Sequence, residues 1–395
     1  MSRHVVVVTQ NVALEHDLRP RREAETLAAA GYDVTLVGGC HTPERVRSQV
    51  DGRVRLQLFA QPPAGDGVGG QMREQGQALA RVLGAVIRSS RRAPVAAVHA
   101  GNPPDNLFFV CRALARIQRS APHFVFDQHD TTPLLLAAKH PGTRVTSYAM
   151  PVLRALERWS FAAASLVVFA NDAYRNRALC EGLLRADSEV VPNGFALPEP
   201  SPQARWRNGT DLVAYVGTIG EQDNVDHLVD AVAILRRRRQ LRVVVAGDGS
   251  GLEAAKRRAR DLGVDRAFEW LGFVTDRALI ASLVRAADVC VAPEIDSEFN
   301  RHSTFIKISE YMSVGAAVAA HRLPQTEALA RESVHYARDM SAQALATALE
   351  DLLEMPHLRR SLGDAATRRF AEAVSWDRVG GPRLVAAYDR LFARP

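Results

Sequence analysis

The residue types with the clearest chemical potential lie together in one segment, HSTFIKISEYMSVG. Ser303 or Thr304 could cap a helix that Gly315 ends, which would put the positive end of the helix dipole at the start of the segment. Lys307 would lie in the first turn, where a cation is unfavourable unless an anion binds beside it. Glu310 would follow on the same face, where a carboxylate can accept hydrogen bonds from paired hydroxyl groups. The segment therefore predicts a site for an anion that carries hydroxyl groups; the alternative is an ordinary surface Lys–Glu pair.

Two glycine-containing loops could bring backbone N–H groups close to such an anion. The run Gly217-Thr218-Ile219-Gly220 follows one strand-like stretch, and Asp248 lies in the run GDGSG after another. Neither run is G-x-G-x-x-G, and the first strand-like stretch of the chain lacks that fingerprint too. This argues against an NAD-type dinucleotide site. A tight turn without a ligand is the alternative for both runs.

Polar residues also follow two strand-like runs in the first half of the chain. His129 and Asp130 come after HFVFD, where an imidazole could donate a hydrogen bond to a hydroxyl group or stabilise developing charge. Asn102 and Asp105 flank a Pro-Pro pair after VAAVH and could also contact a hydroxylated substrate. The alternatives are a structural histidine, and a turn in which Asn102 and Asp105 cap the helix that follows.

Parallel sheets covered by helices must position these residues, because apolar β-branched runs alternate with segments of helical period. The pattern occurs twice, so we expect an α/β fold with two Rossmann-like parallel-sheet domains facing a cleft. The segment 105–119, for example, places Leu107, Val110, Leu114 and Ile117 on one apolar stripe. Strands are predicted at 4–8, 33–37, 53–59, 95–99, 123–127, 166–170, 212–216, 241–246, 268–272, 288–292 and 316–320.

A stretch rich in Pro, Asn and Gly, PNGFALPEPSPQARWRNG, interrupts the pattern and predicts a domain boundary. We expect an N-terminal domain at 1–195, a linker at 196–209 and a C-terminal domain at 210–375. A final helix within 376–395 would cross back to the N-terminal domain. In open α/β sheets, ligands bind outside the carboxyl ends of the strands, so the cleft is the expected site.

Composition excludes several other classes of protein. The chain has 395 residues, of which 47% are hydrophobic, as expected for a globular protein of two domains. Its four cysteines form no paired motif, so neither a metal site nor a disulfide framework is predicted. The ten-residue apolar run FAAASLVVFA is too short to cross a bilayer, and the N-terminus starts a strand rather than a signal peptide. We expect a cytoplasmic protein.

The positive charge is concentrated in one stretch. Residues 75–126 contain seven arginines and one acidic residue. The arginines are Arg81, Arg88, Arg91, Arg92, Arg112, Arg116 and Arg119. Such a charge could hold the protein peripherally at an anionic inner-membrane surface or attract a phosphorylated acceptor. Solvated helix faces are the alternative. Nucleic acid is not an expected partner, because no aromatic residues interleave with these arginines.

Several motifs together resemble one known family. The segment HSTFIKISEYMSVG, with AAVAAHRLPQTEAL after it, resembles the nucleotide-contacting motif of family 4 glycosyltransferases of the GT-B fold, of the bacterial polysaccharide and glycoconjugate type. The segment HDLRPRREAETLAAAGYDV is similar to the family's D-x-R-V-x-x-E-A motif, with Pro20 in place of Val. Further counterparts in the same order are HAGNPPD, FDQHD, FANDAYRNRAL, VPNGF, YVGTIGEQDNVDHL and SWDRVGGPRLVAAYDRL.

This resemblance implies transfer of a sugar from a nucleotide-diphosphate donor of the UDP or GDP type to a sugar, lipid-linked or small-molecule acceptor. It implies retention at the anomeric carbon, no metal and no cofactor, and catalysis by His129, Lys307 and Glu310. It also implies donor-binding roles for Gly217, Thr218, Ile219, Gly220, Asp248, Val274, His302, Ser303, Thr304, Lys307 and Glu310, and roles on the acceptor and sugar side for Asp17, Arg21, Asn102, Asp105, His129 and Asp130.

The chain departs from the family pattern at three places. His302 stands where a glutamate is usual, so a carboxylate role near the sugar would fall to Glu298 or Asp296. The usual basic residues are absent from 217–225, and Leu134 replaces a glutamate after His129. Two alternatives therefore stay open: a nucleotide-sugar epimerase or hydrolase on the same fold, and a non-catalytic protein that binds a nucleotide sugar.

Overall fold

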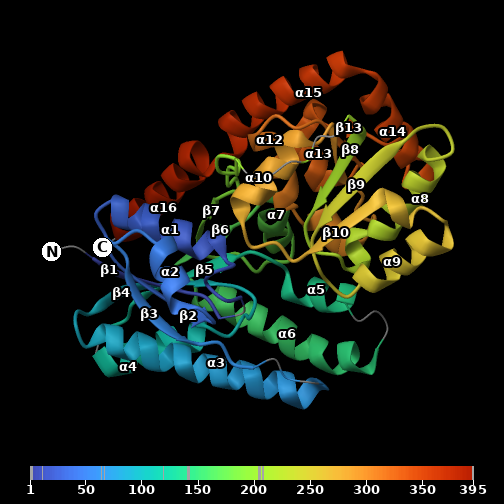
Figure 1. Ribbon diagram of the computed structural model, residues 1–395. Coiled ribbons are helices and arrows are strands. Elements are labelled where there is room, and N and C mark those ends of the chain that lie inside the picture. Colours follow the sequence, from blue (N-terminus) through green and yellow to red (C-terminus); the bar gives the residue numbers. More distant parts are fainter. Residues whose placement is uncertain are drawn as a thin grey trace. The chain divides into compact units, whose positions relative to one another are not determined.

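The computed structural model describes residues 3–10, 12–63, 65, 67–118, 120–139, 143–202, 206 and 209–393. The chain divides into two compact units, coloured along the sequence in Figure 1. Unit 1 comprises Met1–Pro192 and Gly380–Pro395, and unit 2 comprises Asn193–Val379. The division after Pro192 lies a few residues before the stretch predicted as a linker. Within the described residues, no helix is long and apolar enough to cross a membrane.

Unit 1 contains a seven-stranded parallel sheet in the order β3-β2-β1-β4-β5-β6-β7. All six strands predicted for the first half of the chain are present. Every residue of β1 is buried, whereas the edge strand β3 is only partly buried. The short edge strand β7 was not predicted, since its sequence DSEV is largely polar and only its last residue is buried. The strands are β1 His4–Val8, β2 Asp33–Cys40, β3 Arg55–Ala60, β4 Val95–Gly101, β5 His123–Gln128, β6 Leu166–Phe169 and β7 Asp187–Val190.

Helices cover both faces of this sheet (Figure 1). Apolar residues of α3, α4 and α6 form a core on one face, whereas α1 packs against α16 and contacts β1 and β2. The helix predicted at 105–119 begins only at Phe108, and Ile117 is exposed rather than part of the buried stripe. The helices are α1 Leu18–Ala29, α2 Pro43–Gln49, α3 Gly67–Ser90, α4 Phe108–Gln118, α5 Thr132–Lys139, α6 Arg144–Ala163, α7 Asp172–Cys180 and α16 Gly381–Ala393.

Unit 2 contains a six-stranded parallel sheet in the order β10-β9-β8-β11-β12-β13. The two-residue edge strand β13 was not predicted, because it is too short to form an apolar run. The strands are β8 Asp211–Val216, β9 Leu241–Ala246, β10 Phe268–Gly272, β11 Val289–Ala292, β12 Val318–Ala320 and β13 His335–Tyr336.

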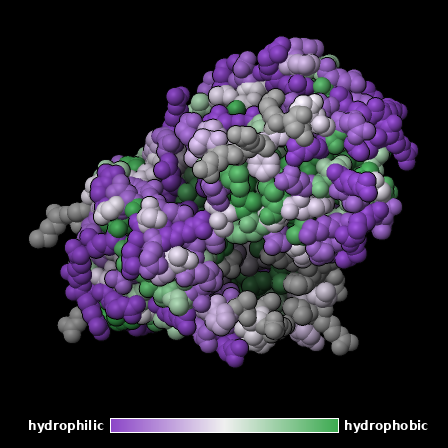
Figure 2. Space-filling model, in the orientation of Figure 1, coloured by the Kyte–Doolittle hydropathy of each residue, from purple (hydrophilic) through white to green (hydrophobic). Residues whose placement is uncertain are grey.

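Alternation along β8 shows how this sheet builds two cores. Val213 and Tyr215 pack with α8, α9 and α14 on one face, whereas Leu212, Ala214 and Val216 pack with α10, α12 and α15 on the other. The helices are α8 Val225–Leu235, α9 Leu252–Asp261, α10 Arg277–Ala286, α11 Glu298–His302, α12 Ile306–Ser313, α13 Pro324–Ala330, α14 Ala342–Glu354 and α15 Pro356–Arg369. Because the apolar residues fill these cores, the surface seen in Figure 2 is mainly hydrophilic.

Candidate active site

The helix that carries Lys307 and Glu310 begins differently from the prediction. Helix α12 starts at Ile306 with Phe305 at its N-cap and without a side-chain cap, so capping by Ser303 or Thr304 was a wrong prediction. Ser303 instead ends the short helix α11, and its hydroxyl donates to the carbonyl oxygen of Phe299 over 2.9 Å. Gly315 follows the end of α12 in a left-handed conformation, with φ of 68°, as the sequence suggested.

Lys307 lies in a buried cluster of polar side chains at the carboxyl end of the sheet of unit 2. Its side chain is only 7% exposed. The ammonium group donates to Glu294 Oε1 over 2.6 Å and to the Tyr215 hydroxyl over 2.8 Å, and Asp223 Oδ1 lies 3.5 Å away. The anionic groups nearest to the Lys307 ammonium are therefore carboxylates of the protein itself.

The cluster holds Lys307 in its charged form. Burial alone would lower the pKa of Lys307, but Glu294 and then Tyr215 and Asp223 outweigh burial and raise that pKa well above its ordinary value. Burial raises the pKa of Glu294, although Lys307 opposes this effect. The sequence analysis missed Glu294, Tyr215 and Asp223; the signal for Glu294 was its position two residues beyond a buried strand.

The two predicted glycine loops are bonded to each other, and the first of them lies beside Lys307. The backbone N–H of Ile219 donates to the carbonyl oxygen of Asp248 over 3.0 Å, and Gly251 N–H donates to the carbonyl oxygen of Ile219 over 2.8 Å. Gly217 has φ of 146°, and a Cβ atom there would lie 2.8 Å from Cε of Lys307. Only glycine fits between the loop and the lysine without a displacement.

The loop from residue 217 is also tied down by side chains. The hydroxyl of Tyr215 donates to the carbonyl oxygen of Thr218. The backbone N–H of Gly220 donates to Asp223 Oδ2 over 3.0 Å. Tyr215 and Asp223 thus contact both Lys307 and the glycine loop, so the cluster and the loop form one structural unit.

Glu310 is buried like Lys307 but has a different partner. Its carboxylate accepts a bond of 2.8 Å from Arg277, whose side chain is 37% exposed. Burial raises the pKa of Glu310, and Arg277 opposes that rise. The alternative of a surface pair between Lys307 and Glu310 was therefore wrong. Arg277, at the start of α10, was not predicted.

Other residues of unit 2 that the sequence singled out bond within the protein or pack against its core. His302 Nδ1 lies 2.9 Å from the carbonyl oxygen of Glu298. Arg301 pairs with Asp296 over 2.8 Å, so one of the two carboxylates considered in place of the missing glutamate is engaged by an arginine. Val274 follows β10 and packs partly against the core.

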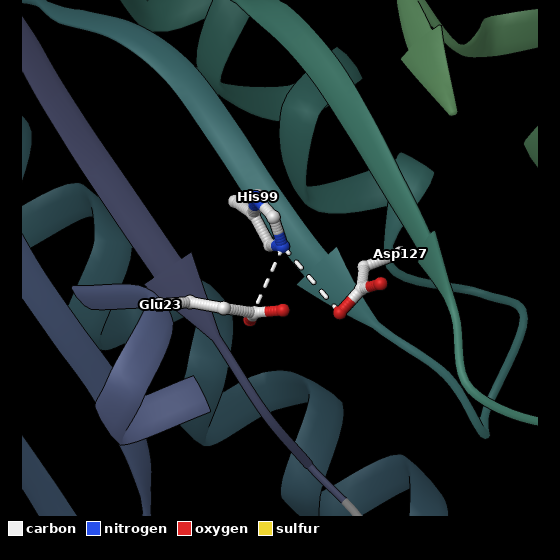
Figure 3. A group of neighbouring side chains, drawn as sticks. All are labelled: Glu23, His99 and Asp127. Atoms are coloured by element: carbon white, nitrogen blue, oxygen red, sulfur yellow. Dashed lines mark ion pairs between the residues drawn. The ribbon is translucent and has the colours of Figure 1, made fainter. Parts of the chain in front are cut away.

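A second buried polar cluster lies in unit 1, at the carboxyl ends of β4 and β5. Figure 3 shows Glu23 from α1, His99 from β4 and Asp127 from β5 pointing toward one another. Nε2 of His99 lies 3.3 Å from Glu23 Oε2 and 3.5 Å from Asp127 Oδ2. The three side chains are at most 1% exposed. Nδ1 of His99 lies 2.9 Å from the hydroxyl of Tyr388, which α16 contributes.

Arg19 balances the charge of this cluster. Its guanidinium donates to Asp127 through two nitrogens, over 2.9 and 2.7 Å, and lies 2.9 Å from Glu23 Oε1. The ligand-type atoms of Glu23, His99 and Asp127 lie within 4.8 Å of one another, close enough to share a metal ion. A cation would compete there with Arg19, so the residues fit an internal ion-pair network better than a metal site.

His129 joins the same network through Asp127. Nε2 of His129 makes a short contact with Asp127 Oδ2, and the side chain is 19% exposed. Burial would lower the pKa of His129, but Asp127 outweighs burial and raises that pKa. A Cβ atom on Gly101 would lie 2.9 Å from Cε1 of His129, so Gly101 makes room for the ring.

The predicted polar residues around His129 form its scaffold. Oδ1 of Asn102 accepts bonds from the backbone N–H groups of His129, over 2.7 Å, and Asp130, over 3.2 Å. Its amide group donates to Asp105 Oδ1 over 2.7 Å. Asn102 and Asp105 are at most 3% exposed, and burial raises the pKa of Asp105 to about 7. In this structure they fix the loop that presents His129.

Asp17 and Arg21 lie at the start of α1, and the structure brings only Asp17 near the histidine. Burial raises the pKa of Asp17, and His129 is the main group that opposes the rise. The guanidinium of Arg21 donates to Gln49 over 2.6 Å and to the backbone of Asp17 over 3.0 Å. Arg19, rather than Arg21, is the arginine of this segment that contacts Asp127.

Both units match family models of sugar-transferring enzymes. The model described as "Glycosyl transferase 4-like domain" matches residues 18–194, and the model described as "Glycosyl transferases group 1" matches residues 210–355. The chain belongs to glycosyltransferase family 4. This membership agrees with the resemblance found in the sequence motifs.

Two curated relatives of this family 4 chain are 30% and 33% identical to it, over only part of their length. A GDP-mannose-dependent alpha-(1-6)-phosphatidylinositol dimannoside mannosyltransferase from Mycobacterium tuberculosis is 30% identical over 49% of this chain and 50% of the relative. A D-inositol 3-phosphate glycosyltransferase from Corynebacterium aurimucosum is 33% identical over 42% and 40%. The chain thus spans about half the length of the curated relatives it matches.

Solved structures show that the family 4 chain has the GT-B fold, with two parallel-sheet α/β domains. Sucrose-phosphate synthase from Thermosynechococcus elongatus has a TM-score of 0.75 at 16% identity, covering 100% of both chains. HepE from Anabaena, in complex with UDP and glucose, has a TM-score of 0.70 at 17% identity, also covering 100% of both. At these identities the likeness concerns the fold alone.

Proposed function

We propose that this protein transfers a sugar from a nucleotide-diphosphate donor to an acceptor hydroxyl group, with retention at the anomeric carbon. The observation that carries the proposal is the buried lysine of α12, which packs against the first of two glycine loops that are bonded to each other. This arrangement offers a fixed cation and the backbone N–H of Thr218 to a phosphate group. The matched family models, and the sugar-transferring activities in the names of the curated relatives, support the same conclusion.

Lys307 is suited to stabilise the leaving diphosphate. An ammonium group has three N–H donors, and short bonds to Glu294 and Tyr215 use two of them. The third faces Asp223 at the long distance of 3.5 Å. We assign this third donor, with the backbone N–H of Thr218, to the phosphate oxygens, because the N–H groups of Gly217, Ile219 and Gly220 already donate within the protein. Because the group is already charged and held in place, it needs no reorganisation when charge develops on the leaving group.

Glu310 is suited to bind the hydroxyl groups of the donor's ribose. Its second carboxylate oxygen can accept a hydrogen bond while the first stays with Arg277. The partly exposed Arg277 would then hold Glu310 ionised despite its burial. The base and the sugar of the donor belong to the same proposal: a UDP- or GDP-type nucleotide, the latter by analogy with the mannosyltransferase relative.

His129 is assigned to the sugar that is transferred. Asp127 engages Nε2, so Nδ1 is the ring atom we assign to a sugar hydroxyl group. The raised pKa of His129 keeps the ring protonated over a wider pH range, so it can donate a hydrogen bond and stabilise charge in the transition state. No metal or cofactor is part of this proposed mechanism.

Transfer assays with a panel of nucleotide sugars would test the proposal. Wild type should transfer sugar with EDTA present, and Glu310→Gln should raise the KM for the donor about tenfold or more. Glu269→Gln is the matched control, because Glu269 is a half-exposed glutamate paired with Arg242 over 3.0 Å. Free or epimerised sugar without an acceptor would instead indicate a hydrolase or an epimerase. Stabilisation by nucleotides without any turnover would indicate a binding protein, and either outcome would overturn the proposal.

A further inference from the structure

The outer surfaces of α4 and α6 in unit 1 expose large apolar side chains. On α6, Tyr148 is 80% exposed, Val152 59% and Trp159 52%, and on α4, Phe109 is 43% and Ile117 53% exposed. We call the surface formed by these five residues and the arginines described below the α4–α6 face. Other apolar residues of these helices, such as Phe161, are buried in the core against the sheet. The exposed apolar residues therefore form a second set, outside that core.

The three exposed residues of α6 form one stripe. Val152 follows Tyr148 by four residues and Trp159 follows Val152 by seven, which places all three on the same side of an α-helix. The stripe continues toward α4, because the rings of Trp159 and Phe108 lie 6.4 Å apart in an edge arrangement. Phe108 in turn stacks at 4.1 Å with the exposed Phe109. Exposed aromatic residues of the two helices are thus linked through the ring of Phe108, which is itself buried.

The same two helices also expose arginines. Arg112 and Arg116 on α4, and Arg154 and Arg158 on α6, are all exposed. None of the four makes an ion pair with any side chain that the structure describes. The two helices contain a single acidic residue, Glu157, and its carboxylate is buried with Arg177 at 2.7 Å. The α4–α6 face is therefore positively charged without compensation.

We propose that the α4–α6 face binds the surface of an anionic lipid bilayer. Tyrosine and tryptophan have an apolar ring and a polar tip, which suits the boundary between headgroups and acyl chains, and arginines attract anionic headgroups. Aliphatic side chains favour lipid over nucleic acid, because Val152 and Ile117 offer no ring on which a base could stack. The charge complementarity favours lipid over a second copy of the face, since two such surfaces would repel each other. This proposal does not rest on the proposed enzyme activity.

Vesicle binding of the full chain would test the proposal. Wild type should float with vesicles of phosphatidylcholine that contain phosphatidylglycerol, more weakly with phosphatidylcholine alone, and less as salt rises. Replacing Tyr148, Val152 and Trp159 with Ser should weaken binding at least tenfold, and replacing the four arginines with Gln should do the same. The control replaces Arg237 and Arg238, two exposed arginines of unit 2, with Gln and should bind like wild type.

Tryptophan fluorescence tests whether the lipid contacts the α4–α6 face itself. Lipids brominated on their acyl chains should quench wild-type tryptophan emission, and Trp159→Phe should remove that quenching while leaving vesicle binding intact. Absence of wild-type binding to anionic vesicles would overturn the proposal, and so would unchanged binding by the two multiple variants. A wild-type dimer that the serine variant converts to a monomer would assign the face to a second copy. Preferential displacement of vesicles by single-stranded RNA would assign it to nucleic acid.

Discussion

The two units each bury a cluster of charged side chains at the carboxyl ends of their strands, and the two clusters are built differently. In unit 2, Lys307 is the cation that Glu294 and Asp223 share. In unit 1, Arg19 and two histidines surround the carboxylates of Glu23 and Asp127. One cluster thus depends on a lysine, and the other contains two histidines, whose charge can change with pH.

Because of this difference, we expect the two clusters to affect different properties of the enzyme. The charge on Lys307 stays constant over the physiological range, because its pKa is raised. In the cluster of unit 1, by contrast, the pKa of His99 is raised to about 9, with burial opposing the effect of Glu23 and Asp127, and the pKa of His129 is raised as well. We therefore expect the pH dependence of activity to come from unit 1, and binding of the donor's phosphates to come from unit 2.

The largest effect is expected from breaking the Lys307–Glu294 pair. Lys307→Met leaves a buried carboxylate without its partner and should destabilise the protein by about 3 to 5 kcal/mol. The double variant Lys307→Met/Glu294→Gln removes both charges and should recover most of that stability in denaturant unfolding. It should still lose about 100-fold in transfer rate, because the cation for the leaving group is gone.

Glu294→Gln alone is the matched control for that pair. It keeps the cation and should retain more activity than the double variant. A double variant that transfers sugar at the wild-type rate would show that Lys307 is structural only, and the contrast between the two clusters would then be lost.

The next largest effect concerns Asp127 and the pH profile. If the protonated ring of His129 is needed, activity persists above the ordinary histidine pKa and falls as pH rises through the raised pKa. Asp127→Asn removes the main group that raises this pKa, so the fall should move to lower pH. Rate measurements across the pH range would show this shift.

Rates at low pH distinguish an effect of Asp127 on the pKa of His129 from a general structural loss in the variant. Asp127→Asn should approach wild-type activity where His129 is protonated in both proteins, whereas a purely structural loss would lower the rate equally at every pH. His335→Gln serves as a control, since His335 pairs with Asp351 on the surface of unit 2. A profile that Asp127→Asn leaves unmoved would contradict the assignment of pH dependence to unit 1.

Much of the fold could be predicted from the sequence, because buried parallel strands are long apolar runs. The strands that escaped prediction, β7 and β13, are edge strands with too few apolar residues. The site was predictable only in part. Lys307 and Glu310 stand in a recognisable segment, but their partners Glu294 and Arg277 come from other elements.

Pairing across elements depends on the order of the strands, which residue spacing does not encode. Arg19 and Glu23 illustrate this limit. At i and i+4 on a helix they have the spacing of an ordinary surface ion pair, yet both are buried. Only the packing of α1 and Tyr388 of α16 around β4 shows that they hold a histidine.

Two glycines offer the finest comparison between the clusters, because each makes room for a cationic side chain. Gly217 has φ of 146° and lies against Lys307, whereas Gly101 lies against the His129 ring without a positive φ. Gly217→Ala should therefore cost about 1 to 3 kcal/mol, since backbone strain adds to the displacement of a buried lysine. Gly101→Ala should cost less than about 1 kcal/mol, because a partly exposed ring can move. Gly31→Ala, with φ of 93° and nothing within 4 Å, isolates the strain. Equal losses for Gly217 and Gly31 in denaturant unfolding would mean that Lys307 yields freely, and its fixed position would no longer distinguish unit 2 from unit 1.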